Sequence, residues 1–154
     1  MSATAAGITP DQDKRADAAI AAMVTAAMGG AVVPVVVSWP TAMAAMGSGV
    51  VAIGLCYGVK LTKDEAWRLI IMFIKAAGLT FCGLTVASQL LSAVLVSTGL
   101  GYGAAIALDA ATCGSIAYAV GGTAKAYFKG ERDMDKVKQR MRRLAKTKKQ
   151  EQEA

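Results

Sequence analysis

Asp109 is the first candidate for chemistry, because it is the single charged residue in a long apolar stretch, residues 76–124. An ionisable residue placed in this way in a membrane protein commonly marks an ion or proton pathway. Gln89, Ser92 and Thr112 lie at similar distances from a glycine-rich bend near residue 100. An antiparallel helical hairpin would bring these polar residues to the depth of Asp109. The alternative is a polar clamp between helices.

Enzymatic and metal chemistry are disfavoured by what the chain lacks. It has no histidine, the commonest general base and metal ligand. Cys56, Cys82 and Cys113 are far apart in apolar segments, which gives neither a disulfide framework nor a zinc spacing. The glycines at 99, 101 and 103 are not followed by the Lys-Ser or Lys-Thr pair of a phosphate loop. We therefore expect no enzymatic activity, no catalytic residue, no metal and no cofactor.

Long stretches without charge point to a membrane protein. The chain is 55% hydrophobic and 18% charged, and residues 18–59 contain no charged side chain at all. A domain of 154 residues leaves much of its surface exposed, so lipid is the simpler surrounding for such stretches. Nothing alternates with a period of two, and four stretches of about 20 apolar residues each suit a bilayer span. We predict an all-α fold of about four apolar helices in membrane-embedded hairpins.

Capping patterns mark where two of these helices begin. Residues 9–12 read Thr-Pro-Asp-Gln and residues 62–65 read Thr-Lys-Asp-Glu, both typical of a reciprocal N-cap. The first helix should loosen near Gly29, a turn is expected at residues 38–40, and the second helix should end near Gly58.

We divide the chain into an N-terminal cap and helix start (1–17), an apolar membrane domain of two hairpins (18–128) and a basic cytoplasmic tail (129–154).

The positive charges predict the orientation of the hairpins. Residues 1–124 hold six basic and six acidic residues, and residues 125–154 hold eleven basic and five acidic ones. Every basic segment falls on one side of a four-span arrangement, so both termini should be cytoplasmic, in a bacterial inner or intracytoplasmic membrane. Tyr57, Trp67 and Tyr127 would then mark the cytoplasmic interface.

The tail has an apolar seam on a cationic helix. Met134, Val137, Met141 and Leu144 recur at intervals of three and four residues. Such a helix can lie on anionic lipid headgroups, pair as a short coiled coil, dock on a protein partner or extend into solvent. Nucleic acid is disfavoured, because stacking aromatic residues are lacking. The residues expected to bind lipid or a partner are Lys136, Lys138, Arg140, Arg142, Arg143, Lys146, Lys148 and Lys149.

Small residues spaced by four favour close helix packing and a homo-oligomer, because they let helix backbones approach in lipid. The pairs are Gly54 with Gly58, Gly99 with Gly103, and Ala110 with Gly114.

Two segments resemble a known family. Tyr57-Gly58-Val59 followed by the helix start at residues 62–66, and residues 101–128 with their terminal Tyr127-Phe128, look like a bacterial hydrophobic domain of unknown function. That domain is fused to, or encoded beside, Era-like GTPases and is shared with YcjF-type inner-membrane proteins. The resemblance implies a helical membrane module that works with a partner, such as a GTPase or an enzyme complex, and it implies no catalytic residue.

We expect a non-enzymatic integral membrane scaffold or accessory subunit that self-associates and uses its basic tail to recruit a cytoplasmic partner or anionic lipid. A holin-like pore or small ion or proton channel using Asp109 is one alternative. A soluble helical shell or filament, in which apolar helices pack between subunits, is the other.

Overall fold

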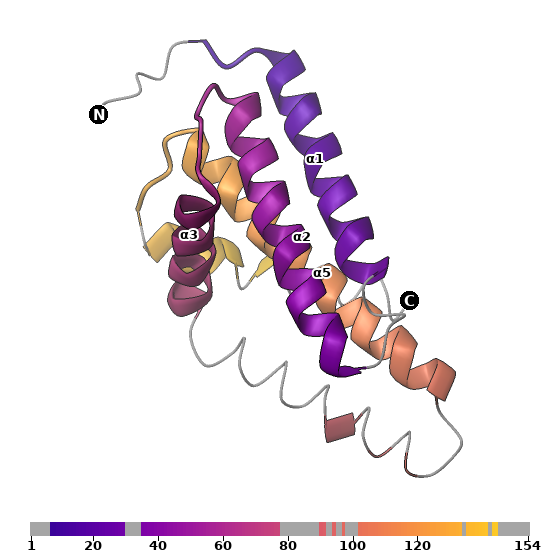
Figure 1. The fold of residues 1–154 in the computed structure, drawn as a ribbon. Coiled ribbons are helices and arrows are strands. Elements are labelled where there is room, and N and C mark those ends of the chain that lie inside the picture. The colour runs from indigo at the N-terminus through magenta and orange to yellow at the C-terminus, as the bar shows by residue number, and fades with distance from the viewer. Residues whose placement is uncertain are drawn as a thin grey trace.

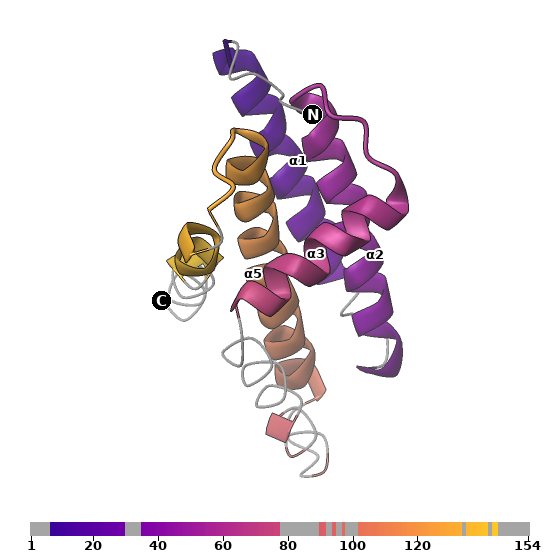
Figure 2. The same cartoon turned by 90° about the vertical axis from the view of Figure 1, so that its left-hand side faces the viewer.

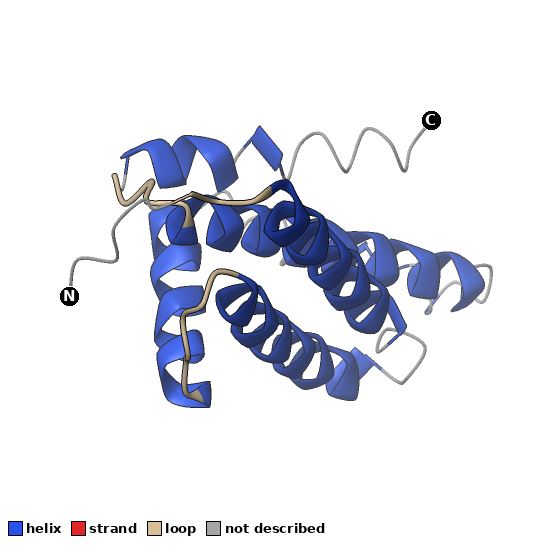
Figure 3. Cartoon of the chain, turned by 90° about the horizontal axis from the view of Figure 1, so that it is seen from above, coloured by secondary structure: helices blue, strands red, loops and turns tan. Residues whose placement is uncertain are grey.

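All the regular secondary structure in the part of the chain that the structure describes is helical (Figure 3). The computed structural model describes residues 7–29, 35–77, 102–133, 135–141 and 143–144, with the isolated positions 90, 91, 94 and 97. The helices are α1 (Pro10–Gly29), α2 (Val35–Cys56), α3 (Lys63–Ala77) and α5 (Tyr102–Phe128). Residues 135–141 and 143–144 are also helical, and we call them the C-terminal segment. The all-α prediction is confirmed for these residues.

Both predicted capping boxes form. At the start of α1, the Thr9 N–H donates to Gln12 Oε1 at 3.0 Å, and the Gln12 N–H donates to Thr9 Oγ1 at 3.4 Å. At the start of α3, the Thr62 N–H donates to Glu65 Oε2 at 2.8 Å, and the Glu65 N–H donates to Thr62 Oγ1 at 3.3 Å. Each box satisfies backbone N–H groups that have no partner within the helix.

Two helices end in the same way, on a glycine with a positive φ. After α2, Gly58 has a φ of 74°, and the Val59 N–H reaches back to the Gly54 carbonyl at 2.9 Å. After α5, Gly130 has a φ of 104°, and the Glu131 N–H donates to the Ala126 carbonyl at 3.1 Å. These are Schellman caps, which favour glycine because other residues are strained at that φ.

The predicted turn at residues 38–40 is wrong, because this segment lies inside α2. Pro40 is the sixth residue of the helix, and the first four N–H groups of any helix lack a partner within it. A proline so close to the start removes one further backbone hydrogen bond. The helix tolerates this loss and begins at Val35, six residues before the predicted start of the second helix at residue 41.

Three helices lie side by side and the fourth crosses them. α1 and α2 run antiparallel, and α5 packs against both (Figure 1). α3 lies obliquely across α2 and α5, as the view in Figure 2 shows. This arrangement buries one face of α3 and leaves the other outside the bundle.

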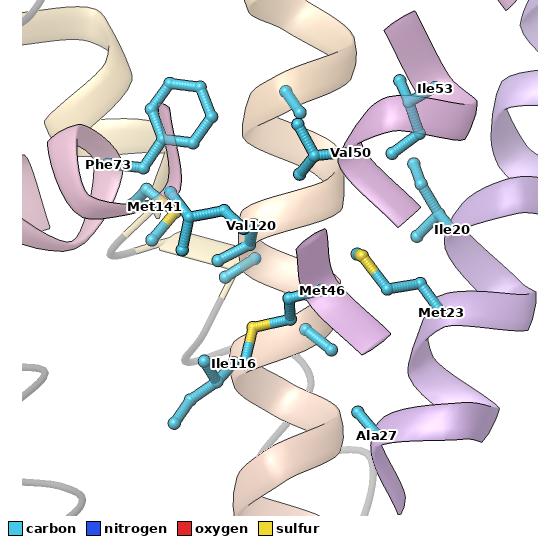
Figure 4. Close-up of a cluster of buried hydrophobic side chains, with 14 of the residues drawn as sticks. Ile20, Met23, Ala27, Met46, Val50, Ile53, Phe73, Ile116, Val120 and Met141 are labelled. Atoms are coloured by element: carbon cyan, nitrogen blue, oxygen red, sulfur yellow. The ribbon is translucent and has the colours of Figure 1, made fainter. Parts of the chain in front are cut away.

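The core gathers one face of α1 and most of the circumference of α5 over residues 113–124, with buried side chains from α2 and α3 (Figure 4). On α1, Ala16, Ile20, Met23 and Ala27 are buried at the three- and four-residue spacing of a helix face. Nine of the buried core residues are alanines. The largest fully buried side chains are those of Phe73, Met46, Ile53, Ile70, Ile116 and Met141.

Two glycines that face Met23 let α1 approach its neighbouring helices closely. A Cβ atom at Gly49 would overlap the Met23 side chain, and a Cβ at Gly121 would lie 2.6 Å from Met23 Cε and 3.0 Å from Ile20 Cγ1. At Gly49 the added atom would also lie 2.8 Å from Met23 Cβ, whereas at Gly121 the nearest atom is the flexible end of Met23. α1 therefore packs closely against both neighbours, and the requirement for glycine is stricter on α2.

The six small residues predicted to pack helices have different surroundings. A Cβ at Gly54 would meet Leu61 Cδ1 at 2.9 Å, in the connection to α3 rather than in another helix. Positions 58 and 103 face open space, and Gly99 lies outside the described residues. Gly114 is buried and Ala110 half-buried on α5. Packing between subunits through these residues stays a prediction.

One helix among the described residues is long and apolar enough to cross a membrane. It covers Gly103–Phe128, and half of its most apolar window is buried inside the chain. The apolar part of α2, Pro40–Cys56, is shorter. The core helix of a soluble protein can pass the same test, and the predicted third span lies mostly outside the described residues. The four-span topology and its orientation stay predictions.

Two glycines of α2, at 47 and 49, provide a matched test of this packing. We expect Gly49→Ala to destabilise the fold by about 1–3 kcal/mol, because the added methyl overpacks the site against Met23. A Cβ added at Gly47 would have no neighbouring atom within 4 Å, so Gly47→Ala should stabilise the helix by about 0.5–1 kcal/mol. Thermal or denaturant unfolding followed by circular dichroism measures both, and equal effects of the two variants would contradict this packing.

Candidate functional site

The predicted site around Asp109 is only partly within the described residues. Asp109 is buried on α5, with 8% of its surface exposed. Gln89 and Ser92 lie outside the described residues, so their approach to Asp109 stays a prediction. The Thr112 hydroxyl donates to the Leu108 carbonyl of its own helix at 2.9 Å. This bond is typical of a hydroxyl satisfied locally in an apolar helix, which agrees with a structural role as readily as with a pathway.

A polar junction that the sequence did not predict joins α1, α2 and α5 at one end of the bundle. The Asp13 carboxylate of α1 accepts a hydrogen bond from the Tyr57 hydroxyl at 2.6 Å, just after α2. Its other oxygen pairs with Lys129 Nζ at 2.5 Å, just after α5. One turn further along α1, Asp17 pairs with Lys125 Nζ at 2.6 Å. We call Asp13, Asp17, Tyr57, Lys125 and Lys129 the polar junction.

Hydrogen bonds within the polar junction determine the protonation states of Asp13 and Tyr57. The Lys129 ammonium and then the Tyr57 hydroxyl, which both donate to the carboxylate, hold the pKa of Asp13 below its usual value. Burial, followed by the hydrogen bond to the Asp13 carboxylate, raises the pKa of Tyr57 above its usual range. At neutral pH the carboxylate is therefore charged and the phenol protonated. Such a pair holds helices together and does not suit proton transfer.

A cavity of about 800 Å³ lies beside the junction, between α1, α5 and the C-terminal segment. Its walls include the apolar side chains of Ile20, Val24 and Leu144. Its cations are matched by carboxylates: Lys125 pairs with Asp17, Lys129 with Asp13, and Arg140 with Glu131 at 2.7 Å. Because each of these cations is paired with a carboxylate, the cavity has no unpaired positive charge among them that would bind an anion. Among the described residues, no group of three Cys, Asp or Glu side chains is placed to hold a metal ion.

The C-terminal segment has the predicted amphipathic form, and its seam packs against its own chain. Val137 and Met141 are 2% and 0% exposed and belong to the core cluster (Figure 4). Leu144 packs at Gly122 of α5, where an added Cβ would lie 2.6 Å from Leu144 Cδ1. The segment starts at a cap in which Asp133 Oδ1 accepts from the Asp135 N–H at 3.0 Å. The C-terminal segment therefore packs against helices of the predicted apolar domain (18–128).

The cationic side of the segment stays exposed. Four of the eight predicted lipid- or partner-binding residues are described and exposed: Lys136, Lys138, Arg140 and Arg143. The other four lie outside the described residues: Arg142, Lys146, Lys148 and Lys149. Burial of the seam turns these charges outward. The described part of the segment thus exposes its charged side, and its own chain covers the apolar side.

Acid should weaken the polar junction in a predictable direction. The pKa of Asp13 is lower in the folded chain than in the unfolded chain, so its charged form stabilises the fold. That stabilisation is complete above the unfolded pKa of about 4 and is lost as the pH falls through the lower folded value. We expect Asp13→Asn to lower the melting temperature at pH 7, and the difference from the parent to shrink as the pH falls below about 4.

Asp11→Asn is the control, because the Asp11 pair with Arg15 lies on the surface with both side chains more than 70% exposed. It should change the melting temperature little. Equal losses in the two variants, or a loss in Asp13→Asn that does not change with pH, would contradict the proposed role of the junction.

Comparison with known protein families gives a match over nearly the whole chain. A family model described as a domain of unknown function, DUF697, matches residues 3–153. Comparison with curated proteins and with solved structures returned no match. The family match agrees with the resemblance to a hydrophobic domain of unknown function, while the link to GTPases stays a proposal. The chain belongs to the DUF697 family.

Proposed function

We propose that this protein is a non-enzymatic membrane scaffold or accessory subunit of the bacterial inner membrane, with both termini in the cytoplasm. The main observation behind the proposal is that small residues lie in the interior while several large apolar residues are exposed. Alanine and glycine occupy much of the described interior, whereas Leu55, Leu90, Leu91 and Val94 are each more than half exposed. Helices in lipid pack through small residues and turn large apolar ones outward. Large exposed apolar side chains in water would instead favour aggregation.

The character of α5 supports the same proposal. About 20 apolar residues are enough to cross a bilayer, and the apolar part of α5 has 26. α1 and α2 both pack against this helix, so it would enter lipid as the centre of a helical group rather than alone. The exposed residues named above would then contact lipid or a second copy of the chain.

The exposed cations of the C-terminal segment support recruitment of a partner. Lys136, Lys138 and Arg143 are exposed next to a seam that its own chain covers. An anionic surface is the matching partner, either lipid headgroups or an acidic patch on a protein. The resemblance to the domain that accompanies Era-like GTPases favours a GTPase as that protein.

Fractionation tests the membrane proposal. After a carbonate wash, we expect the full chain to stay in the membrane pellet, because its apolar contacts with lipid do not depend on charge. In detergent its size should exceed the 15.8 kDa of the monomer after the detergent is subtracted. Release into the soluble fraction would contradict the proposal and favour the alternative of a helical shell or filament.

Charge reversal tests the tail without disturbing its seam. Deletion of the tail would remove Val137 and Met141 from the core, so Lys136→Glu with Lys138→Glu is the better variant. We expect it to fold and reach the membrane like the parent, and to lose co-purification of the partner that the parent captures. Lys14→Glu with Arg15→Glu, at exposed positions of α1, is the matched control. Equal capture by both variants would contradict recruitment through the tail.

A further inference from the structure

Four residues at a regular spacing lie on a side of α3 that is not packed in the core of the bundle. Lys63, Trp67, Ile71 and Lys75 recur at every fourth residue and so share one side of the helix. We call these four residues the α3 stripe. Trp67 is 41% and Ile71 37% exposed, and both lysines are exposed.

The opposite face fixes how α3 is turned. Ala66, Ile70 and Phe73 are fully buried, and the Phe73 ring meets the Tyr127 ring edge-on at 5.8 Å between centroids. Since this face is anchored in the core, Trp67 and Ile71 lie on the exposed part of α3, and the start of the stripe borders α2. The exposure of Trp67 and Ile71 is therefore set by the fold.

The apolar surface of the stripe continues onto α2. A groove of about 600 Å³ joins the start of α3 to the outer face of α2. It is lined by Pro40, Met43, Ala44, Gly47, Ser48, Lys63, Asp64 and Trp67. Trp67 thus stands at the edge of a shallow and mostly apolar surface that spans two helices.

We propose that the α3 stripe lies in the headgroup region of an anionic bilayer, with α3 parallel to the membrane plane. Tryptophan favours this region, where its ring is apolar and its N–H meets water or headgroups. A lysine at each end can lay its alkyl stem along lipid and place its ammonium at a phosphate. Within the described residues, neither Lys63 nor Lys75 forms an ion pair, so both charges are available. The inference rests on the proposed membrane function and names the lipid contact of α3.

Charge and size favour lipid over a protein as the occupant. A stable protein interface buries about 800 Å² on each partner, with a large aromatic and aliphatic centre. The α3 stripe offers two large apolar side chains between two cations, which is little for such an interface. Shallow insertion beside a helix that already crosses the bilayer needs no more than this.

Trp67 fluorescence tests the position directly. The chain has two tryptophans, so Trp39→Phe leaves Trp67 as the single reporter. The full chain is reconstituted into phosphatidylcholine vesicles, with and without phosphatidylglycerol, that carry lipids brominated near the headgroup or near the bilayer centre. We expect stronger quenching of Trp67 by the shallow bromines, and more of it when phosphatidylglycerol is present. Lys63→Glu with Lys75→Glu should remove that dependence on phosphatidylglycerol, whereas Lys14→Glu with Arg15→Glu should keep it.

Three results would overturn the inference. Absence of quenching while the protein floats with the vesicles would place Trp67 in water or against protein, and the proposed membrane function would survive. A Trp67 emission shift that depends on protein concentration and not on lipid would assign the surface to a second copy of the chain. Failure of the protein to float with any vesicle would contradict the membrane function as well.

Discussion

The Asp13 carboxylate links the ends of three helices, and the contacts of Met23 are in register with it. Tyr57 and Lys129 reach it from just beyond α2 and α5. Gly49 and Gly121 each lie eight residues before these partners, about 12 Å back along their helices. Met23 lies ten residues after Asp13, about 15 Å forward along α1, which runs antiparallel to α2 (Figure 1), so this displacement is toward the same end of the bundle. The junction thus brings the methionine level with the two glycines that accommodate it.

The same end of the bundle determines what the tail can do. The Schellman cap at Gly130 turns the chain back after α5, and the cap at Asp133 starts the C-terminal segment directly afterwards. With so short a connection, the apolar seam falls on α5, and the cations of the segment are left on the outside. A free amphipathic tail would offer both faces to a membrane. This segment offers charge, so a partner that it recruits has to be recognised electrostatically.

The features that were predictable from sequence are those decided within a few residues. Thr9 with Gln12, and Thr62 with Glu65, are three residues apart, and both capping boxes form as expected. Asp13 and Lys129 are 116 residues apart, and no local pattern singles them out from the other charged residues.

The glycine and alanine pairs spaced by four residues stay a prediction, and sequence alone could not decide between them for a related reason. In a chain so rich in alanine and glycine, many pairs share a four-residue spacing. Which glycines lie in close contact depends on residues far away in the sequence, as at Gly49 and Gly121, which meet Met23 of another helix. The sequence of α5 also does not decide whether this helix is surrounded by lipid or by protein. The hydroxyls of Thr112 and Ser115 donate to carbonyls four residues back in their own helix, so they are satisfied in lipid or in a protein core alike. The two alternatives differ in what the residues packed around α5 expose on their outer side. Leu55 and Trp67 are exposed among these neighbouring residues, and such exposed apolar side chains are why we propose a bilayer as the surrounding.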